Sequence, residues 1–304
     1  MRQNAATARP ATRQATRPPS PRAAARWPIV AGLVVAALAA ALVAYAVRSS
    51  APDSHPTADG FGHVHGMAVD DTGALFVATH VGLYRVQDRN TAVRVSAETP
   101  DLMGFTTDGP GRFLASGHPG AHGDGPANLG LIESTDGGVT WRNTSLAGAA
   151  DFHGLQAAHG AVYGYNSTDG VFMVSTGRET WDRRSAGAMG AFAVSPTDAD
   201  TVLAVTRAGL QRSTDGGRTW QPVPGGGGFA AMSWTTAGLW GIGPDGAVRQ
   251  SADGGTTWQQ RGTVPGEPHA VTAGAGALYV AVTGDTIFAS RDSGVTWVPH
   301  YSPR

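Results

Sequence analysis

Apolar residues follow two different patterns along this chain of 304 residues. Near the N-terminus, Pro28 to Val47 forms one uninterrupted stretch of 20 residues without a charge, which is long enough to cross a bilayer as a helix. From about residue 61 onward, the apolar runs are short and are separated by turns rich in Gly, Asp and Pro. Such runs between such turns predict β-strands, and strong helix signals are missing from this part of the chain.

The long apolar stretch predicts a membrane anchor. Six Arg residues precede it and one, Arg48, follows it at once. By the positive-inside rule, residues 1–27 form a disordered basic tail in the cytoplasm, residues 28–47 span the cell membrane, residues 48–60 form a linker, and the rest is extracytoplasmic. A cleaved secretory signal, with release of the protein, is the alternative. The stretch is longer than the usual apolar core of about 7–15 residues in such signals, which favours the anchor.

One eight-residue motif recurs through the rest of the chain. Four copies span 134–141, 213–220, 251–258 and 290–297, and a fifth, at 175–181, is one residue short. The closing Trp residues stand at 141, 181, 220, 258 and 297, which gives a period of 38 to 40 residues. A period of that size with short strands predicts an all-β fold, a β-propeller. An alignment of the strands that begin each unit gives six blades over residues 61–304.

The repeated motif resembles the Asp-box, or BNR repeat, of sialidase-like propellers. Its first copy reads Ser134-Thr-Asp136-Gly-Gly138-Val-Thr140-Trp141. The Asp side chain bonds to nearby backbone N–H groups, glycines allow the turn, and Trp supplies apolar surface. The resemblance implies turns on the outer rim with structural aspartates. The opening His63-Val-His65-Gly66 is also similar to an actinobacterial glycosylhydrolase-like group, and the wider family includes receptors and an assembly factor of photosystem II.

The first strands of the six predicted blades carry unusual side chains at corresponding positions. The third aligned position holds His65, Met103, His153, Met189, Phe229 and His269, and the position two residues earlier holds His63, Asp101, Asp151, Gly187, Gly227 and Glu267. Residues two apart lie on one side of a strand, so both sets are expected to converge at the mouth of the central channel. The loops between second and third strands bring His80 and His118 to the same end.

Imidazole and thioether groups gathered in this way predict a metal site. The candidate ligands are His63, His65, His80, Met103, His118, His153, Met189 and His269. Met sulfur selects Cu(I), and His suits both copper states, so copper is the expected ion. A neighbouring carboxylate orients a ligating His through its second nitrogen. The alternative is that these Met and His residues fill apolar gaps in the core.

A glycoside hydrolase is the second interpretation of the chain. The resemblance to sialidases implies three clustered Arg residues, a Tyr nucleophile with a Glu, and an Asp acid–base, but no inner strand here begins with Arg. The acids that remain for hydrolysis are Asp101, Asp151 and Glu267, since two carboxylates about 5–10 Å apart suffice. A third interpretation is a protein-assembly or receptor scaffold.

Composition excludes some classes of function. After residue 52 the chain has 15 Arg against 23 Asp and Glu, so a binding surface for nucleic acid is not expected. It contains no Cys, which excludes disulfides and thiolate metal sites. The sequence therefore predicts a membrane-anchored extracytoplasmic propeller that acts as a binding module. Its ligand at the propeller face is a metal ion, a glycan or a protein.

Overall fold

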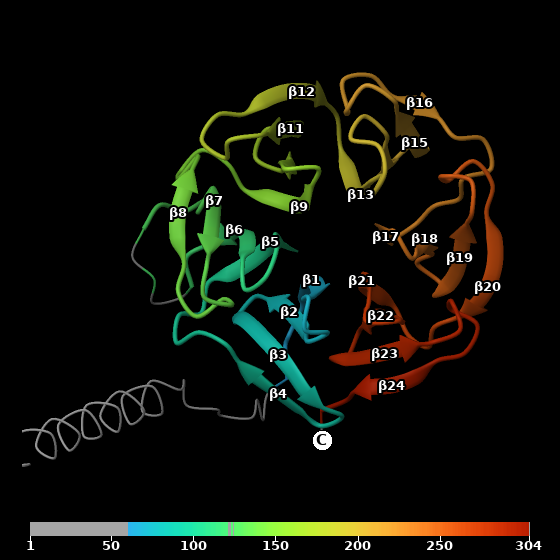
Figure 1. Ribbon diagram of the computed structural model, residues 1–304, viewed down its shortest axis with the longest axis horizontal. Coiled ribbons are helices and arrows are strands. Elements are labelled where there is room, and N and C mark those ends of the chain that lie inside the picture. Colours follow the sequence, from blue (N-terminus) through green and yellow to red (C-terminus); the bar gives the residue numbers. More distant parts are fainter. Residues whose placement is uncertain (1–59, 121–122, 124, 304) are drawn as a thin grey trace, which may run out of the picture. The chain divides into compact units, whose positions relative to one another are not determined.

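The computed structural model describes residues 60–120, 123 and 125–303, and this part folds into six four-stranded antiparallel sheets arranged around a central axis (Figure 1). The sheets are the blades of a propeller, numbered here in chain order. Blades 1 to 3 comprise β1 (Val64–Val69), β2 (Leu75–Thr79), β3 (Gly82–Asp88) and β4 (Thr91–Arg94); β5 (Asp101–Thr107), β6 (Phe113–His118), β7 (Leu131–Ser134) and β8 (Arg142–Ser145); and β9 (Phe152–Ala158), β10 (Ala161–Asn166), β11 (Val171–Ser175) and β12 (Asp182–Ala186). Blades 4 to 6 comprise β13 (Met189–Val194), β14 (Val202–Thr206), β15 (Gly209–Ser213) and β16 (Gln221–Pro222); β17 (Ala231–Thr235), β18 (Gly238–Ile242), β19 (Ala247–Ser251) and β20 (Gln259–Thr263); and β21 (Pro268–Gly274), β22 (Ala277–Val282), β23 (Thr286–Ser290) and β24 (Val298–Tyr301). The prediction of a six-bladed all-β propeller is confirmed.

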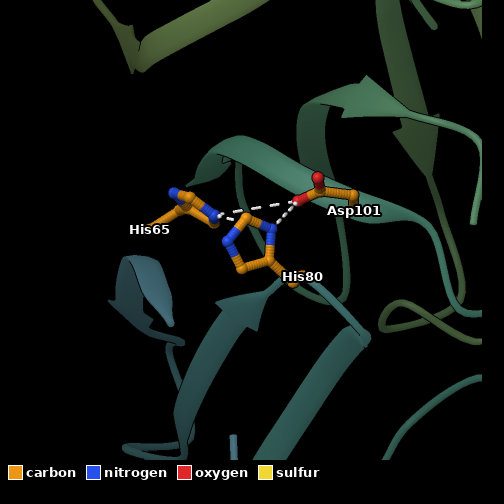
Figure 2. A group of neighbouring side chains, drawn as sticks. All are labelled: His65, His80 and Asp101. Atoms are coloured by element: carbon orange, nitrogen blue, oxygen red, sulfur yellow. Dashed lines mark hydrogen bonds and ion pairs between the residues drawn. The ribbon is translucent and has the colours of Figure 1, made fainter. Parts of the chain in front are cut away.

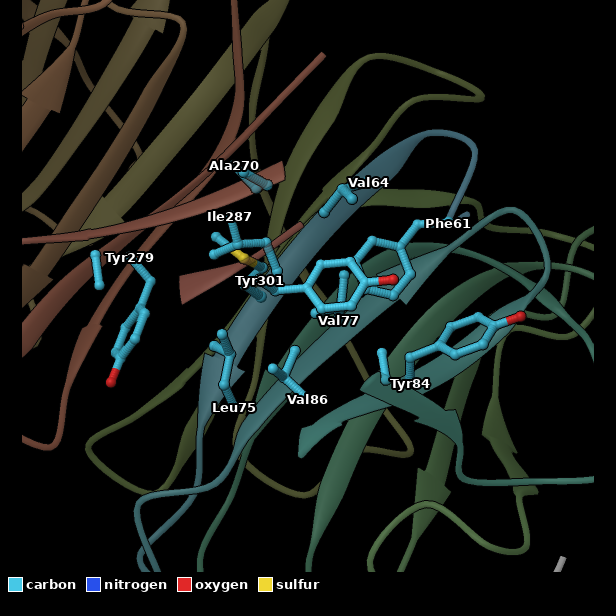
Figure 3. Packing of buried hydrophobic residues seen from close by; sticks show 14 of the residues in the cluster. Phe61, Val64, Leu75, Val77, Tyr84, Val86, Ala270, Tyr279, Ile287 and Tyr301 are labelled. Atoms are coloured by element: carbon cyan, nitrogen blue, oxygen red, sulfur yellow. The ribbon is translucent and has the colours of Figure 1, made fainter. Parts of the chain in front are cut away.

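The ring closes by packing between the first and last blades. Within the described residues, every blade consists of four strands that are consecutive in the chain, and none is exchanged between the first and last blades. Instead, Phe61 lies against Tyr84 of blade 1 and Tyr301 of blade 6, with ring centroids 5.4 and 4.7 Å apart (Figure 3). All three rings are almost fully buried. Burial of large apolar side chains therefore stabilises the junction between the first and last blades, which the sequence pattern did not predict.

The repeated motifs form the turns between the third and fourth strands. In the turn after β15, the Asp215 carboxylate accepts hydrogen bonds from the backbone N–H and hydroxyl of Thr219, at 2.9 and 2.6 Å. The Ser213 hydroxyl donates to Asp215 at 2.7 Å and accepts from the N–H of Gly217 at 2.7 Å. The other three complete copies repeat this arrangement, so the predicted turn chemistry is confirmed.

A glycine in each complete turn contacts the preceding blade. Gly217 has φ of +91°, and a Cβ there would stand 2.3 Å from a ring carbon of Phe172. In the short fifth copy, Arg178 takes the equivalent place: its φ is +66° and its N–H donates to the Ser175 hydroxyl at 2.7 Å. The Arg178 side chain reaches Glu133 of blade 2 at 2.6 Å. An ion pair with a buried carboxylate thus replaces the close apolar contact at this junction.

Bulges interrupt the inner strands near the end that carries the predicted site. In blade 1, Val64 and Gly66 pair with consecutive residues of β2, which leaves His65 as the extra residue. The same geometry leaves out Met103 in blade 2, His153 in blade 3 and His269 in blade 6. A bulge changes the direction of a side chain relative to a regular strand. The four residues share one place in their blades because of the bulge, as the alignment predicted.

Blades 4 and 5 depart from the alignment of the first strands. In blade 4 the bulged residue is Gly190, so the alignment is one residue out there, and Met189 pairs with Thr206. In blade 5 the first strand begins only at Ala231, and Phe229 is buried in a hydrophobic cluster with Leu203 and Leu239. Local glycine content explains both shifts, because Gly187 and Gly225–Gly228 form the entries to these strands with several positive φ angles.

The expected tail, membrane helix and most of the linker lie outside the described residues. Within 60–120, 123 and 125–303, no helix is long and apolar enough to cross a membrane.

Candidate functional site

The central channel contains a cavity of about 590 Å³ that is lined by the first strands of the blades. Four of the predicted ligands, His65, His153, Met189 and His269, are among its lining residues. The bulges described above place three of these at the same end of their strands, where the loops after the second strands also lie. This end is called the mouth below.

Four imidazole rings meet at the mouth, between blades 6 and 1. The His63 ring lies 4.7 Å from that of His65, 5.7 Å from that of His80 and 4.3 Å from that of His269, measured between centroids. The rings of His65 and His80 are 4.4 Å apart and perpendicular. His63 directly precedes β1, His65 lies in β1, His80 lies in the loop after β2, and His269 lies in β21, about 200 residues further along the chain. The predicted convergence of histidines is therefore present at this junction.

Three atoms that could ligate a metal ion, two imidazole nitrogens and one carboxylate oxygen, lie close together in this cluster (Figure 2). His65 Nε2 lies 3.3 Å from His80 Nδ1 and 3.7 Å from Asp101 Oδ1, and His80 Nδ1 lies 2.9 Å from the same oxygen. These residues form a group of His and Asp side chains, among the described residues, whose ligand atoms all lie within 4.8 Å of one another. A tetrahedral ion with bonds of about 2.0–2.1 Å needs ligand atoms about 3.3 Å apart, which lies within the range of these separations.

The environment keeps the His65 imidazole neutral at physiological pH. Burial lowers the pKa of His65 to about 4, and the neighbouring imidazoles of His80 and His63 act in the same direction, against the opposing charge of Asp101. The side chain is 11% exposed. Only a neutral imidazole offers a lone pair to a metal ion. His65 is thus ready to ligate without first losing a proton.

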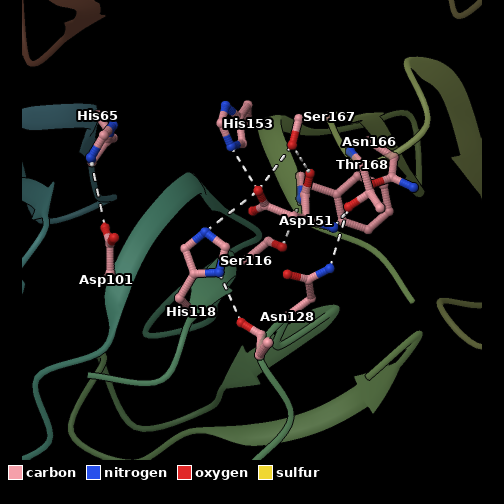
Figure 4. A network of polar contacts seen from close by, with 12 residues as sticks. His65, Asp101, Ser116, His118, Asn128, Asp151, His153, Asn166, Ser167 and Thr168 are labelled. Atoms are coloured by element: carbon pink, nitrogen blue, oxygen red, sulfur yellow. Dashed lines mark hydrogen bonds and ion pairs between the residues drawn. The ribbon is translucent and has the colours of Figure 1, made fainter. Parts of the chain in front are cut away.

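A second polar group lies one blade further on, around Asp151 (Figure 4). Its Oδ2 atom is 2.7 Å from His153 Nε2 and 3.6 Å from His118 Nε2, and it accepts a hydrogen bond from the Ser167 hydroxyl at 2.9 Å. Burial alone would raise the pKa of Asp151. The hydrogen bond and charge of His153, with Ser167 and His118, outweigh that effect and hold the pKa below its usual value. Asp151 is therefore an anion that faces two imidazoles.

Residues that the sequence analysis did not single out position Asp151. Asn166 Oδ1 accepts a hydrogen bond from the Asp151 N–H at 2.9 Å, and Ser167 also donates to the Asp151 carbonyl at 3.0 Å. In blade 6, the Thr283 hydroxyl lies 2.9 Å from His269 Nε2 and donates to Glu267 at 3.4 Å. The backbone N–H groups of Ser167 and Thr283 donate to the carbonyls of Asp151 and Glu267, each of which directly precedes the first strand of its blade. Asp101 and His118 pair in the same way in blade 2. Residues at the end of the second strand, or directly after it, are therefore the ones to examine as partners of these acids.

The remaining predicted residues have other surroundings. Met103 is partly buried at the bulge of β5, and Met189 lines the channel while it packs beside the hydrophobic cluster of blades 3 and 4. Two histidines that were not assigned to the site lie elsewhere: His159 hydrogen-bonds the Ser195 carbonyl at 2.7 Å, and His300 packs on Tyr279.

The pKa of Asp151 bears on the glycoside hydrolase interpretation. A glycosidase needs one carboxyl group that keeps its proton near neutral pH. The lowered pKa of Asp151 does not suit it to that role. Two imidazoles and one carboxylate, by contrast, are a common ligand set for transition metals.

Comparisons with known proteins agree with the fold. Residues 211–222 match the BNR/Asp-box repeat. A comparison with curated proteins gives no match. Among solved structures, the chain is similar to one in a nidogen/laminin complex, with a TM-score of 0.57, 10% identity, and coverage of 76% of this chain and 93% of that one.

Two propeller enzymes are also similar. The GH74 xyloglucanase from Xanthomonas campestris gives a TM-score of 0.53 at 16% identity, covering 81% of this chain but 46% of that one, so this chain spans less than half of the enzyme. The virginiamycin B lyase from Staphylococcus aureus gives a TM-score of 0.52 at 14% identity, covering 83% of this chain and 88% of that one. At such identities these likenesses show the fold, and the site must be judged on its own geometry.

Proposed function

We propose that this protein binds a transition-metal ion at the mouth of the propeller, through His65 Nε2, His80 Nδ1 and Asp101 Oδ1. The observation that carries the proposal is the set of separations among these three atoms, 2.9, 3.3 and 3.7 Å, which bracket the edge of a tetrahedral metal site. The atoms come from two different blades, so their convergence depends on the tertiary fold.

Copper(II) or zinc is the ion that this ligand set favours. Imidazole and carboxylate suit both, and copper(II) stands above zinc in intrinsic affinity for nitrogen and oxygen ligands. Three protein ligands leave a coordination position open, as in metal sites that exchange a ligand or bind a substrate. The imidazoles of His63 and His269 lie beside the group, with ring centroids 4.3 Å apart, where they are placed to contact whatever fills that position.

The proposal also includes the place where the protein acts. The apolar stretch at residues 28–47 and the Arg residues before it favour a propeller held on the outer side of the cell membrane. An anchored propeller that binds metal ions would meet them outside the cytoplasm.

Metal titration of the full-length chain tests the proposal. After removal of metals with a chelator, copper(II) or zinc binding is measured by equilibrium dialysis and elemental analysis. We expect His80→Ala to weaken binding by about 100-fold, because it removes one of three ligands. His300→Ala, which changes a histidine away from the mouth, serves as the matched control and should bind like the unaltered protein. Equal affinity in the two variants would exclude this site.

A further inference from the structure

The group around Asp151 occupies the same place in the fold as the first site, one blade further along the ring. His80 directly follows β2 and His118 ends β6, while Asp101 begins β5 and Asp151 directly precedes β9. His80 Nδ1 is 2.9 Å from Asp101 Oδ1, and His118 presents its other nitrogen, Nε2, 3.6 Å from Asp151 Oδ2. The propeller thus repeats one imidazole–carboxylate pair across two successive junctions.

The hydrogen bonds of His118 define which of its nitrogens faces Asp151. Its Nδ1 lies 2.8 Å from the carbonyl oxygen of Ala127, and a carbonyl oxygen only accepts, so Nδ1 carries the proton. The other ring nitrogen, Nε2, faces Asp151 Oδ2 at 3.6 Å, which is too long for a direct hydrogen bond. An ion held between these two atoms would have both of them as ligands. Ligating histidines are commonly held in this way, with the second nitrogen donating to a backbone carbonyl.

Asp151 has unused capacity to bind a cation. Its side chain is 8% exposed, and its Oδ1 atom is buried and receives no hydrogen bond from the described residues. A buried carboxylate oxygen without a partner is costly. Ser167, His153 and His118 all approach the other oxygen, Oδ2. The carboxylate therefore turns Oδ2 toward both imidazoles and leaves Oδ1 without a hydrogen bond from the described residues.

We infer that the mouth holds a second transition-metal site, built from His118, Asp151 and His153. Figure 4 shows His118 and His153 approaching the carboxylate from two directions. An ion coordinated by both imidazoles would therefore require one of the two side chains to rotate toward the other. His153 has the freedom to do this, because 42% of its side chain is exposed. That movement makes the second site weaker than the first, whose donor atoms already lie within 4.8 Å of one another.

Stoichiometry in paired variants tests this inference. Metal-stripped full-length protein is dialysed against copper(II) at a pH of about 8, and bound copper is counted by elemental analysis and followed by electron paramagnetic resonance. We expect two equivalents with distinct spectra in the unaltered protein. His118→Ala should remove the weaker equivalent, His80→Ala the tighter one, and the double variant both. His153→Asn, a change at an exposed ring, should weaken the second equivalent by at least about 10-fold without affecting folding.

The outcomes separate this inference from the proposed function. Loss of one equivalent in His118→Ala and His153→Asn, with none lost in His80→Ala, would support the second site and contradict the first. A single equivalent that disappears only in His80→Ala would overturn the second site and leave the first intact. A second equivalent that persists in both His118→Ala and His153→Asn would also overturn it. Asp151→Asn, which preserves the volume of the side chain, provides a further check if the alanine variant unfolds.

Discussion

Aspartates in the rim turns and aspartates at the mouth make similar hydrogen bonds but have different roles in this propeller. Asp215, in a rim turn, binds Ser213 and Thr219, which lie within four residues of it. Asp101, at the mouth, meets His80 from 21 residues earlier and His65 from the same neighbouring blade. The first arrangement exists wherever the local sequence forms its turn. The second exists only when two blades have packed together.

The causes of the lowered pKa values show the same contrast. The hydroxyl and N–H of Thr219 lower the pKa of Asp215 well below its usual range, without help from any distant group. At the mouth, the pKa of Asp151 is lowered against the effect of burial, by imidazoles and a hydroxyl that come from blades 2 and 3. Rim aspartates therefore stabilise turns, whereas Asp151 at the mouth places a negative charge among imidazoles.

The largest expected effects come from replacing one aspartate at the mouth and one at the rim, which should change metal affinity and stability separately. Asp101→Ala should weaken copper(II) binding by about 100-fold, because a first ligand is removed, while the unfolding midpoint changes little. Asp215→Ala should do the reverse: it lowers the unfolding midpoint and leaves the metal affinity unchanged. Dialysis and urea unfolding of both variants measure the two effects. If Asp215→Ala also lost metal binding, the division between rim and mouth would be wrong.

The next effect concerns the rim alone. Gly217→Ala should reduce the free energy of unfolding by about 3 kcal/mol, because the new methyl group meets Phe172 in a backbone conformation unfavourable for side chains. Gly137→Ala is the matched control, since it has φ of +76° in another rim turn but open space around it. It should cost only about 1 kcal/mol. Equal losses in urea unfolding would mean that contact between blades adds nothing at these turns.

Acid should destabilise the mouth through His65. The folded protein has a pKa of about 4 at this group, below the usual value of 6.5, so the unfolded chain binds the extra proton first as pH falls. The stability contributed at pH 7 is lost between 6.5 and about 4. From pH 7 to 5 this amounts to about 2 kcal/mol. With chelator present, urea unfolding should show this loss in the unaltered protein and a smaller loss in His65→Gln; parallel curves would contradict it.

The smallest expected effect tests the equivalence of the blades. Met103 occupies the bulge of blade 2 that His65 occupies in blade 1. Met103→His should therefore supply a third imidazole near His118 and strengthen the weaker copper(II) site by about 3- to 10-fold. Met103→Leu, which keeps an apolar side chain, is the control. Equal copper(II) affinities of the two variants in the dialysis experiment would show that a histidine at the bulge of blade 2 does not take the place that His65 has in blade 1.

Much of the fold could be predicted from sequence because its determinants are local. The five Trp residues at a period of 38 to 40 gave the repeat, and each Ser–Asp–Gly–Thr turn forms from contacts of four residues or fewer. The gathering of His63, His65, His80 and His269 also followed from the alignment of the strands. Each of these inferences needs only the pattern within one blade and the fact that blades are arranged in a ring.

The partners within the site could not be predicted in the same way. Whether His80 meets Asp101 or another acid depends on how blades 1 and 2 pack, which no local pattern encodes. The roles of Ser167 and Thr283 depend likewise on strand pairing, and the bulge at Gly190 shifted one register by a single residue. Closure of the ring by Phe61 and Tyr301 joins residues 240 positions apart, so it became visible only in three dimensions.

A crystal of the copper-loaded full-length protein, with anomalous diffraction recorded at the copper absorption edge, tests the central claim most directly. The account predicts an anomalous peak about 2.0–2.2 Å from His65 Nε2, His80 Nδ1 and Asp101 Oδ1, at the mouth of the channel. A protein that carries copper with its peak elsewhere, or a loaded crystal in which these three side chains keep their contacts with no peak between them, would contradict it.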